Sequence, residues 1–246
     1  MRNSRRSDVD PFIVMDVMQR AAEAEAAGRH IIHMEVGQPG TAAPKTAQDA
    51  LSRALPSNAM GYSVALGLPE LRAGIARLYA DWYGISLSPE RVIVTSGSSG
   101  AFLLAFTALF DTGARVGIGA PGYPSYFQIL KALDLTPVSI ETAAETKFQL
   151  TATQIAEADL DGVMVASPAN PSGTMLDKPE LRAVIEAAQG SGAAFISDEI
   201  YHGLGYERRA VSALEVSDDI YVINSFSKYF SMTGWRIGWM VVPEDH

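Results

Sequence analysis

The chain has 246 residues, of which 48% are hydrophobic and 19% charged, and its formal net charge is −9. The length predicts one large domain, and the composition is that of a folded protein with a well-filled core. Because the sequence holds no cysteine, disulfides, thiolate metal ligands and a cysteine nucleophile are excluded. The negative charge argues against nucleic acid as a partner, since phosphate backbones are bound by clustered cations.

Neither a membrane nor a metal is expected as a partner. The most apolar run, Ala101–Phe110, has ten residues, which is about half of a membrane span. His30 and His33 lie three apart on a segment expected to be extended, and we do not expect them to be metal ligands. The sequence therefore favours a soluble enzyme of the cytoplasm.

The first elements form an N-terminal extension. A helix is predicted over Val9–Ala27, because apolar residues recur there at helical spacing, and Gly28 is placed to end it. His30–Val36 is expected to be extended. We expect residues 1–40 to form an N-terminal helix and arm, and residues 41–246 to form one large domain.

From Pro69 onward, short apolar runs alternate with helical stretches. The predicted strands are Val92–Thr95, Arg115–Gly119, Thr136–Ile140, Gly162–Ala166, Ala193–Ser197 and Ile220–Asn224, with Ile237–Val242 as a seventh candidate. The predicted helices are Pro69–Tyr83, Ser99–Phe110, Tyr123–Leu133, Thr151–Ala158 and Pro179–Gln189. Strands that are apolar throughout are typical of sheets covered on both faces. The alternation predicts an α/β fold with a doubly wound, mostly parallel, seven-stranded sheet.

In such a sheet, ligands bind where the loops leave the carboxyl ends of the strands. The loop after the first predicted strand contains Ser98 and Ser99 and leads into an apolar helix. Backbone amides and hydroxyls at a helix start can bind a phosphate group, although the same serines would also serve as ordinary caps. Gly97 and Gly100 form only an incomplete dinucleotide-binding turn, so a nicotinamide-dependent dehydrogenase is set aside.

Three further loops carry polar side chains to the same edge. Asp198 ends an apolar strand, where an unpaired carboxylate is costly and needs a cationic or donor partner, which a nearby arginine could be. Asn170 lies between Pro168 and Pro171, either as an ordinary turn residue or as an amide held toward a ligand. Tyr123 offers a flat ring, although a buried core position is the commoner place for tyrosine.

Lys228 follows the predicted strand Ile220–Asn224 in a run of serines and aromatic residues. A lysine in a desolvated pocket has a lowered pKa and can form Schiff bases. Arg236, eight residues further on, is a cation among apolar residues and calls for an anion nearby. Together with the loops described above, these two residues favour a catalytic site over surface or purely structural roles.

The segment Ser225–Gly238 resembles the pyridoxal-phosphate attachment signature of the class I/II aminotransferases, which have fold type I, over fourteen consecutive residues. The similarity extends along nearly the whole chain, and further segments match the family's motifs in the same order. These segments are Gly61–Ser63, Gly67–Arg72, Pro121–Pro124, Asn170–Thr174 and Ser197–Tyr201. The resemblance implies that the chain is the large, cofactor-binding domain of this family and that the smaller C-terminal domain is largely missing.

The resemblance also implies a role for each matching residue. Lys228 would hold pyridoxal 5'-phosphate as a Schiff base and move the substrate proton, and Asp198 would pair with the ring nitrogen. Tyr201 and Asn170 would bind the phenolic oxygen, while Tyr123 would stack on the ring. The phosphate would be bound by Ser98, Ser99, Ser225 and Arg236, with Tyr62 reaching it from the partner subunit.

Gly37 lies where the family's N-terminal segment folds over the substrate, and Asn170 would contact the substrate as well. The reaction implied is the transfer of an amino group from an α-amino acid to a 2-oxo acid by a homodimer. Two alternatives stay open: a pyridoxal-phosphate-dependent β-lyase of the same fold, and a non-catalytic pyridoxal-phosphate-binding module. No basic helix-turn-helix precedes the domain, which argues against a regulator of that last kind.

Overall fold

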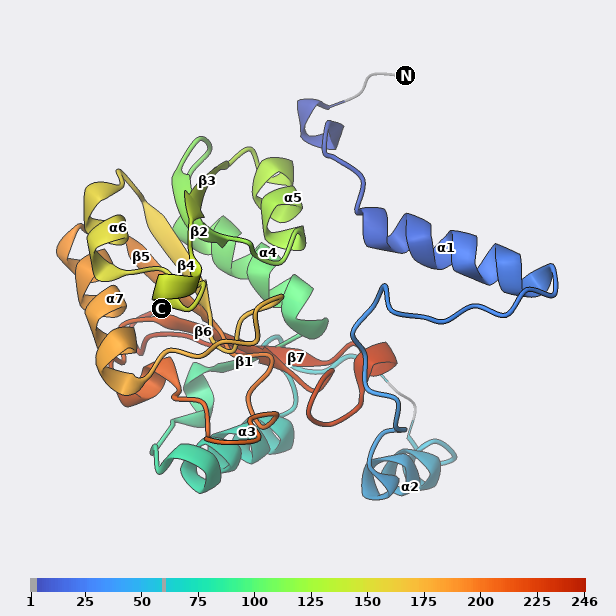
Figure 1. The fold of residues 1–246 in the computed structure, drawn as a ribbon. Coiled ribbons are helices and arrows are strands. Elements are labelled where there is room, and N and C mark those ends of the chain that lie inside the picture. Colours follow the sequence, from blue (N-terminus) through green and yellow to red (C-terminus); the bar gives the residue numbers. More distant parts are fainter. Residues whose placement is uncertain (1–3, 59–60) are drawn as a thin grey trace.

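A computed structural model describes residues 4–58 and 61–246, and its centre is one seven-stranded sheet (Figure 1). Each strand agrees with its predicted run to within one residue at either end, so the expected α/β fold is confirmed. The strands are β1 (Val92–Thr95), β2 (Arg115–Ala120), β3 (Thr136–Glu141), β4 (Gly162–Ala166), β5 (Ala194–Asp198), β6 (Tyr221–Ser225) and β7 (Gly238–Val241). The helices are α1 (Ile13–Ala26), α2 (Lys45–Ala54), α3 (Pro69–Tyr83), α4 (Gly97–Leu109), α5 (Ser125–Ala132), α6 (Ala152–Glu157) and α7 (Lys178–Gly190).

Most helix bounds agree with the prediction to within two residues, and two helices differ further. Helix α1 begins at Ile13 rather than Val9, because Pro11 disfavours helical geometry at the residue before it. Helix α2, which begins directly after Pro44, was not predicted. Its ten residues are largely polar and none of them is buried, so its few apolar residues at helical spacing, Ala47, Leu51 and Ala54, form a stripe that is easily overlooked in the sequence.

The order of the strands in the sheet is β1-β7-β6-β5-β4-β2-β3. The contacts between β2 and β3, β2 and β4, β4 and β5, and β5 and β6 are parallel. Strand β7 is antiparallel to both of its neighbours, β6 and β1, so β1 runs in the same direction as β6. Six strands therefore share one direction, and the loops that follow them leave the sheet at the same edge.

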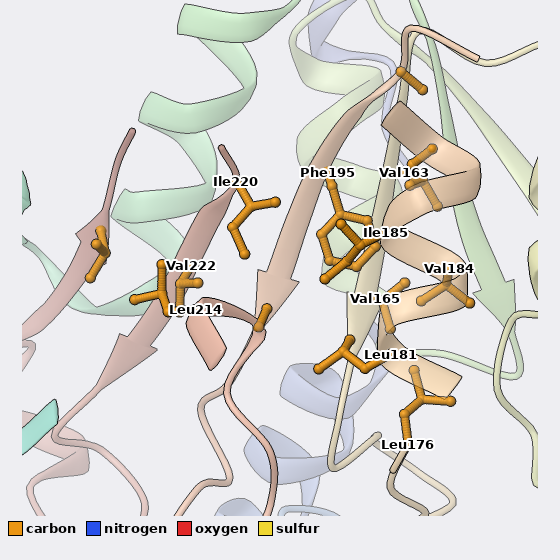
Figure 2. Packing of buried hydrophobic residues seen from close by; sticks show 14 of the residues in the cluster. Val163, Val165, Leu176, Leu181, Val184, Ile185, Phe195, Leu214, Ile220 and Val222 are labelled. Atoms are coloured by element: carbon orange, nitrogen blue, oxygen red, sulfur yellow. The ribbon is translucent and has the colours of Figure 1, made fainter. Parts of the chain in front are cut away.

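The core has two layers, one on each face of the sheet. Successive strand residues alternate between them: Phe195 belongs to the layer under α3, α6 and α7, and Ile196 to the layer under α4 and α5. Figure 2 shows part of the first layer, with Ile185 of α7 among the side chains packed near Phe195. Because both faces are covered, the central strands are apolar at consecutive positions, as the sequence indicated.

The N-terminal helix α1 lies away from the sheet (Figure 1) and buries none of its residues. Gly28 follows it with a φ of +84°, the left-handed geometry that ends many helices. The division into an arm of residues 1–40 and a domain of residues 41–246 stays a prediction, and residues 1–3 of that arm lie outside the described ones. Across residues 4–58 and 61–246, no helix has the length and apolar content needed to cross a membrane.

We expect Ile185→Ala to lower the free energy of unfolding by about 2–5 kcal/mol, because it leaves a cavity between α7 and the sheet. Ile185 is fully buried, with 0% of its surface exposed. Leu55→Ala is the matched control, since Leu55 is 56% exposed and should cost well under about 1 kcal/mol. Urea unfolding of both variants measures the difference, and equal losses would contradict this description of the core.

Candidate active site

Asp198 is the last residue of β5, and only 3% of its surface is exposed. One carboxylate oxygen accepts a hydrogen bond from the Tyr126 hydroxyl, and the other accepts one from the backbone N–H of Ile200 at 3.0 Å. Burial raises the pKa of Asp198 to about 6, against the opposing effect of these two hydrogen bonds. Within the described residues Asp198 has no ion-pair partner, so donor groups rather than an arginine hold it.

Tyr126 was missed by the sequence analysis. It lies in α5, 72 residues before its partner Asp198, and is buried against Phe102 with its ring at 5.2 Å from that ring. A tyrosine in an apolar helix gives no signal of a polar partner. Its only clue is its spacing, three residues after Tyr123, whose ring meets it edge to face at 5.3 Å.

Asn170 and Tyr201 meet at the same edge of the sheet. The Asn170 amide donates to the Tyr201 hydroxyl oxygen at 3.4 Å. Tyr201 is half-buried. Burial is the main cause that raises the pKa of Tyr201, and the negative charge of Asp198 raises it further. Tyr123 is also half-buried at this edge, and its ring contacts Phe12 as well as Tyr126. The structure thus brings these predicted residues together around Asp198.

Lys228 follows β6 and reaches the same place. Its Nζ lies 5.7 Å from the centre of the Tyr201 ring and donates to the carbonyl oxygen of Gly37 at 2.9 Å. Burial lowers the pKa of Lys228, the positive charge of Arg236 lowers it further, and the charge of Asp198 opposes both. This amine can therefore lose its proton more easily than a surface lysine, which is what a nucleophile or proton carrier needs.

Arg236 lies against the start of α4. A Cβ atom added to Gly97, the first residue of α4, would come within 2.2 Å of an Arg236 guanidinium nitrogen, so only glycine leaves room for this approach. Gly238 is constrained more strictly, because its Cβ would meet the backbone of Gly97 at 2.6 Å, and backbone atoms cannot swing aside as a side chain can. The guanidinium donates to the Thr233 carbonyl oxygen at 2.8 Å, and no carboxylate pairs with it in the described part of the chain.

A cation at the positive end of a helix forms an anion site. Ser98 and Ser99 lie in the first turn of α4, and their hydroxyls have no hydrogen-bond partner among the described residues. The helix begins at Gly97, with Ser96 as the flanking residue, so Ser98 and Ser99 are inside the helix and are not its caps. Ser225 ends β6, is 2% exposed, and accepts a hydrogen bond from the Ser227 N–H at 3.1 Å.

The N-terminal arm crosses this edge. Gly37 of the arm accepts the bond from Lys228, and directly after the arm the Thr41 hydroxyl lies 2.8 Å from that of Ser231. Tyr62 is the exception among the predicted residues: it is fully exposed, and no contact joins it to the others within the described chain.

A cavity of about 560 Å³ opens beside Asn170 and Tyr201, toward Tyr206 and Glu207. Within the described residues, no group of histidine and acidic side chains could hold a metal ion.

Comparison with known proteins identifies the family. The family model "Aminotransferase class I and II" matches residues 29–246. The chain is 48% identical to the valine–pyruvate aminotransferase of Mycobacterium tuberculosis, with 98% of this chain and 63% of that protein covered. A solved structure from Silicibacter pomeroyi superimposes with a TM-score of 0.92 at 65% identity, covering 100% of this chain and 64% of that one. The aspartate aminotransferase of Thermus thermophilus with maleate gives a TM-score of 0.94 at 31% identity, covering 100% and 66%.

The chain belongs to the class I and II aminotransferases. It spans a little under two thirds of the length of the relatives it matches. Class I and II aminotransferases depend on pyridoxal 5'-phosphate, whose phosphate, ring and aldehyde match the side chains found here. The fit is shown by the unpaired Arg236 at the start of α4, the glycine that this approach requires, the buried Asp198 and the lysine of lowered pKa.

We expect the cofactor-free protein to lose stability as the pH rises through the range in which Asp198 ionises. The folded state holds this proton up to a pKa of about 6, whereas an exposed aspartate has an ordinary pKa of 3.8, so the folded state binds more protons between these values. Stability then falls with rising pH. Relative to Asp198→Asn, the wild type should lose about 2–3 kcal/mol between pH 4 and pH 7.

Urea unfolding at the two pH values measures this difference, with Asp111→Asn as the control because Asp111 is exposed. If Asp198→Asn and Asp111→Asn change the pH dependence equally, the carboxyl group of Asp198 is not the buried acid described here.

Proposed function

We propose that the protein is a pyridoxal-phosphate-dependent aminotransferase that transfers an amino group from an α-amino acid to a 2-oxo acid. The observation that carries this is the position of Lys228, whose amine of lowered pKa lies beside the Tyr201 ring at the edge that also holds the buried Asp198. Relatives named valine–pyruvate aminotransferase and aspartate aminotransferase support the same reaction class.

When bound, the cofactor supplies an aldehyde that captures amines and a ring that accepts electrons from the carbon next to the captured nitrogen. Lys228 would hold it through Nζ as a Schiff base. When the substrate amine takes its place, the freed Nζ would carry the proton taken from the substrate α-carbon, because its lowered pKa makes it easier for the amine to give up a proton and so to act as a base. Breaking its bond to the Gly37 carbonyl would release the amine for this work.

Asp198 would hold the proton of the ring nitrogen, which keeps the ring electron-poor. Its hydrogen bonds from Tyr126 and Ile200 fix the carboxylate from the protein side. Asn170 and Tyr201 would donate to the phenolic oxygen, and Tyr123 would stack on the ring. Each of these roles suits the side chain's place at the edge of the sheet.

The phosphate would be bound at the start of α4 by a set of hydroxyl and guanidinium groups, namely Ser98, Ser99, Ser225 and Arg236. Tyr62 would complete this set from a second copy of the chain, which makes a homodimer part of the proposal. Support comes from the full exposure of the Tyr62 ring and from the apolar residues exposed near it, Val64 at 58% and Leu68 at 55%.

The substrate would lie between Asn170 and the arm at Gly37, with the cavity beside Asn170 open to it. The proposal keeps residues 1–40 as an arm that folds over this place and residues 41–246 as the cofactor-binding domain. It also places the enzyme in the cytoplasm, where amino acids and 2-oxo acids are available for exchange.

We expect wild-type protein mixed with pyridoxal phosphate and then reduced with borohydride to carry one covalent adduct, on Lys228. Peptide mass spectrometry would locate it. Lys228→Ala should carry none, because it lacks the amine, whereas Lys178→Ala should behave as the wild type, since Lys178 is an exposed lysine of α7. An adduct on a different lysine in the wild type would overturn the site.

A half-reaction separates transamination from β-elimination. The cofactor-loaded protein, given an α-amino acid and no oxo acid, should release one equivalent of the matching 2-oxo acid and keep the amino group on the cofactor. Asp198→Ala should retain some cofactor but lose at least about 100-fold in this rate. Release of pyruvate and ammonia would identify a β-lyase, and binding without turnover would identify a non-catalytic module. Unchanged turnover in Asp198→Ala would remove its role.

A further inference from the structure

The loop Ser167–Thr174, between β4 and α7, carries Asn170. The Asn170 side chain makes one hydrogen bond within the described residues, and at 3.4 Å from the Tyr201 hydroxyl that bond is long. A contact of this length does not fix the amide by itself. The position of Asn170 therefore depends on what holds the backbone of its loop.

Gln149 holds this loop from one side. It lies between β3 and α6, and only 4% of its surface is exposed. Its Nε2 donates to the Ala166 carbonyl at 3.2 Å and to Thr174 twice, at the carbonyl at 3.0 Å and at the hydroxyl at 3.3 Å. One amide group therefore ties the residue before the loop to the last residue of the loop. Gln149 and Asn170 also line the same small cavity of about 40 Å³.

His202 holds the loop from the other side. It is 2% exposed, and its Nε2 lies 2.8 Å from the Ser167 carbonyl oxygen. A carbonyl oxygen can only accept, so Nε2 carries the hydrogen and donates it. On the other ring nitrogen, Nδ1 lies 2.6 Å from the Tyr83 hydroxyl and 3.5 Å from a Glu199 oxygen, which fixes the plane of the ring.

We propose that Gln149 and His202 are positioning residues that clamp the Ser167–Thr174 loop from its two sides and so hold Asn170 opposite the Tyr201 hydroxyl. His202 directly follows Tyr201 in the chain, so its bond to Ser167 sets the distance between the two segments that carry Asn170 and Tyr201. This inference builds on the proposed function, in which those two side chains bind the phenolic oxygen of the cofactor.

Gln149 and His202 are buried, and among the described residues no other side chain donates to the backbone carbonyl groups that they hold. Gln149→Met keeps the length of the side chain but leaves the Ala166 carbonyl without its side-chain donor, and a buried polar group without a partner is costly. The contacts inside the loop, from the Ala169 N–H to the Thr174 carbonyl and from the Gly173 N–H to the Ala169 carbonyl, would remain. We therefore expect the loop to keep its turns but to move as a unit.

The first test uses the cofactor-free protein and amide hydrogen exchange. Peptides that cover residues 167–176 should exchange about tenfold faster in Gln149→Met and in His202→Leu than in the wild type. His202→Gln should restore slow exchange, because its amide can donate to the Ser167 carbonyl. Gln189→Met is the control, since Gln189 bonds to Ser217 and Asp219 at the surface of α7.

The second test uses protein loaded with pyridoxal phosphate. In Gln149→Met and His202→Leu we expect a cofactor dissociation constant about five- to tenfold higher. The pH midpoint of the cofactor's visible absorbance should also rise by about 0.5 unit, because weaker donors stabilise the anionic oxygen less. A purely structural role would lower the unfolding midpoint without moving the absorbance midpoint. His202→Gln should return the absorbance midpoint to the wild-type value.

The outcomes separate this inference from the proposed function. If the wild type does not bind pyridoxal phosphate, the proposed function fails, and the exchange rates alone decide whether the clamp exists. The clamp is overturned if the wild type binds pyridoxal phosphate but both variants keep the wild-type hydrogen-exchange rates and the wild-type absorbance midpoint. Should His202→Leu fail to fold, Gln149→Met carries the test by itself, because the two bonds lie on opposite sides of the loop.

Discussion

The common direction of six strands is the constraint on which the site depends. Because β1 to β6 all end at the same edge, the residues that follow them meet there although they are far apart in the chain. Asp198 ends β5, Ser225 ends β6 and Ser98 follows β1, so a carboxylate and two hydroxyl groups come together without any long loop. Strand β7 runs the other way, and its first residue, Gly238, packs directly on the start of α4. The antiparallel strand thereby brings Arg236, two residues before it, to the helix end.

Two charges at this edge have no ionic partner in the described part of the chain. Asp198 is buried and has only neutral donors, and Arg236 stands at the positive end of α4 with a carbonyl group as its partner. A ligand that is cationic at one end and anionic at the other would satisfy both. Pyridoxal phosphate has this distribution, with its protonated ring nitrogen and its phosphate. Lys228 lies where its pKa responds to both charges, and this links the amine to the same ligand.

How far the sequence could predict the structure depends on the kind of signal. Apolar strands covered on both faces are visible as runs, and Asp198 and Lys228 are visible because a charged group next to such a run is unusual. Tyr126, Gln149 and His202 were not predicted, because each looks like an ordinary residue until the fold places it beside a partner. Gln149 lies 17 and 25 residues from the two residues it joins, and only the packing of the β3–α6 connection against β4 brings them together. The family resemblance supplied roles for the motif residues, but not the residues that support them.

The arrangement that suits a ligand is unfavourable without one. Asp198 is desolvated, and Arg236 adopts a φ of +55° beside a helix start. Each feature raises the free energy of the cofactor-free fold, since a non-glycine residue in that region is strained and a cation near a helix N-terminus is repelled. A ligand that binds only the folded state raises the free energy of unfolding, and the increase is larger when the ligand binds more tightly. Replacing these charges with neutral groups would therefore stabilise the cofactor-free protein and weaken the binding for which the edge of the sheet is shaped.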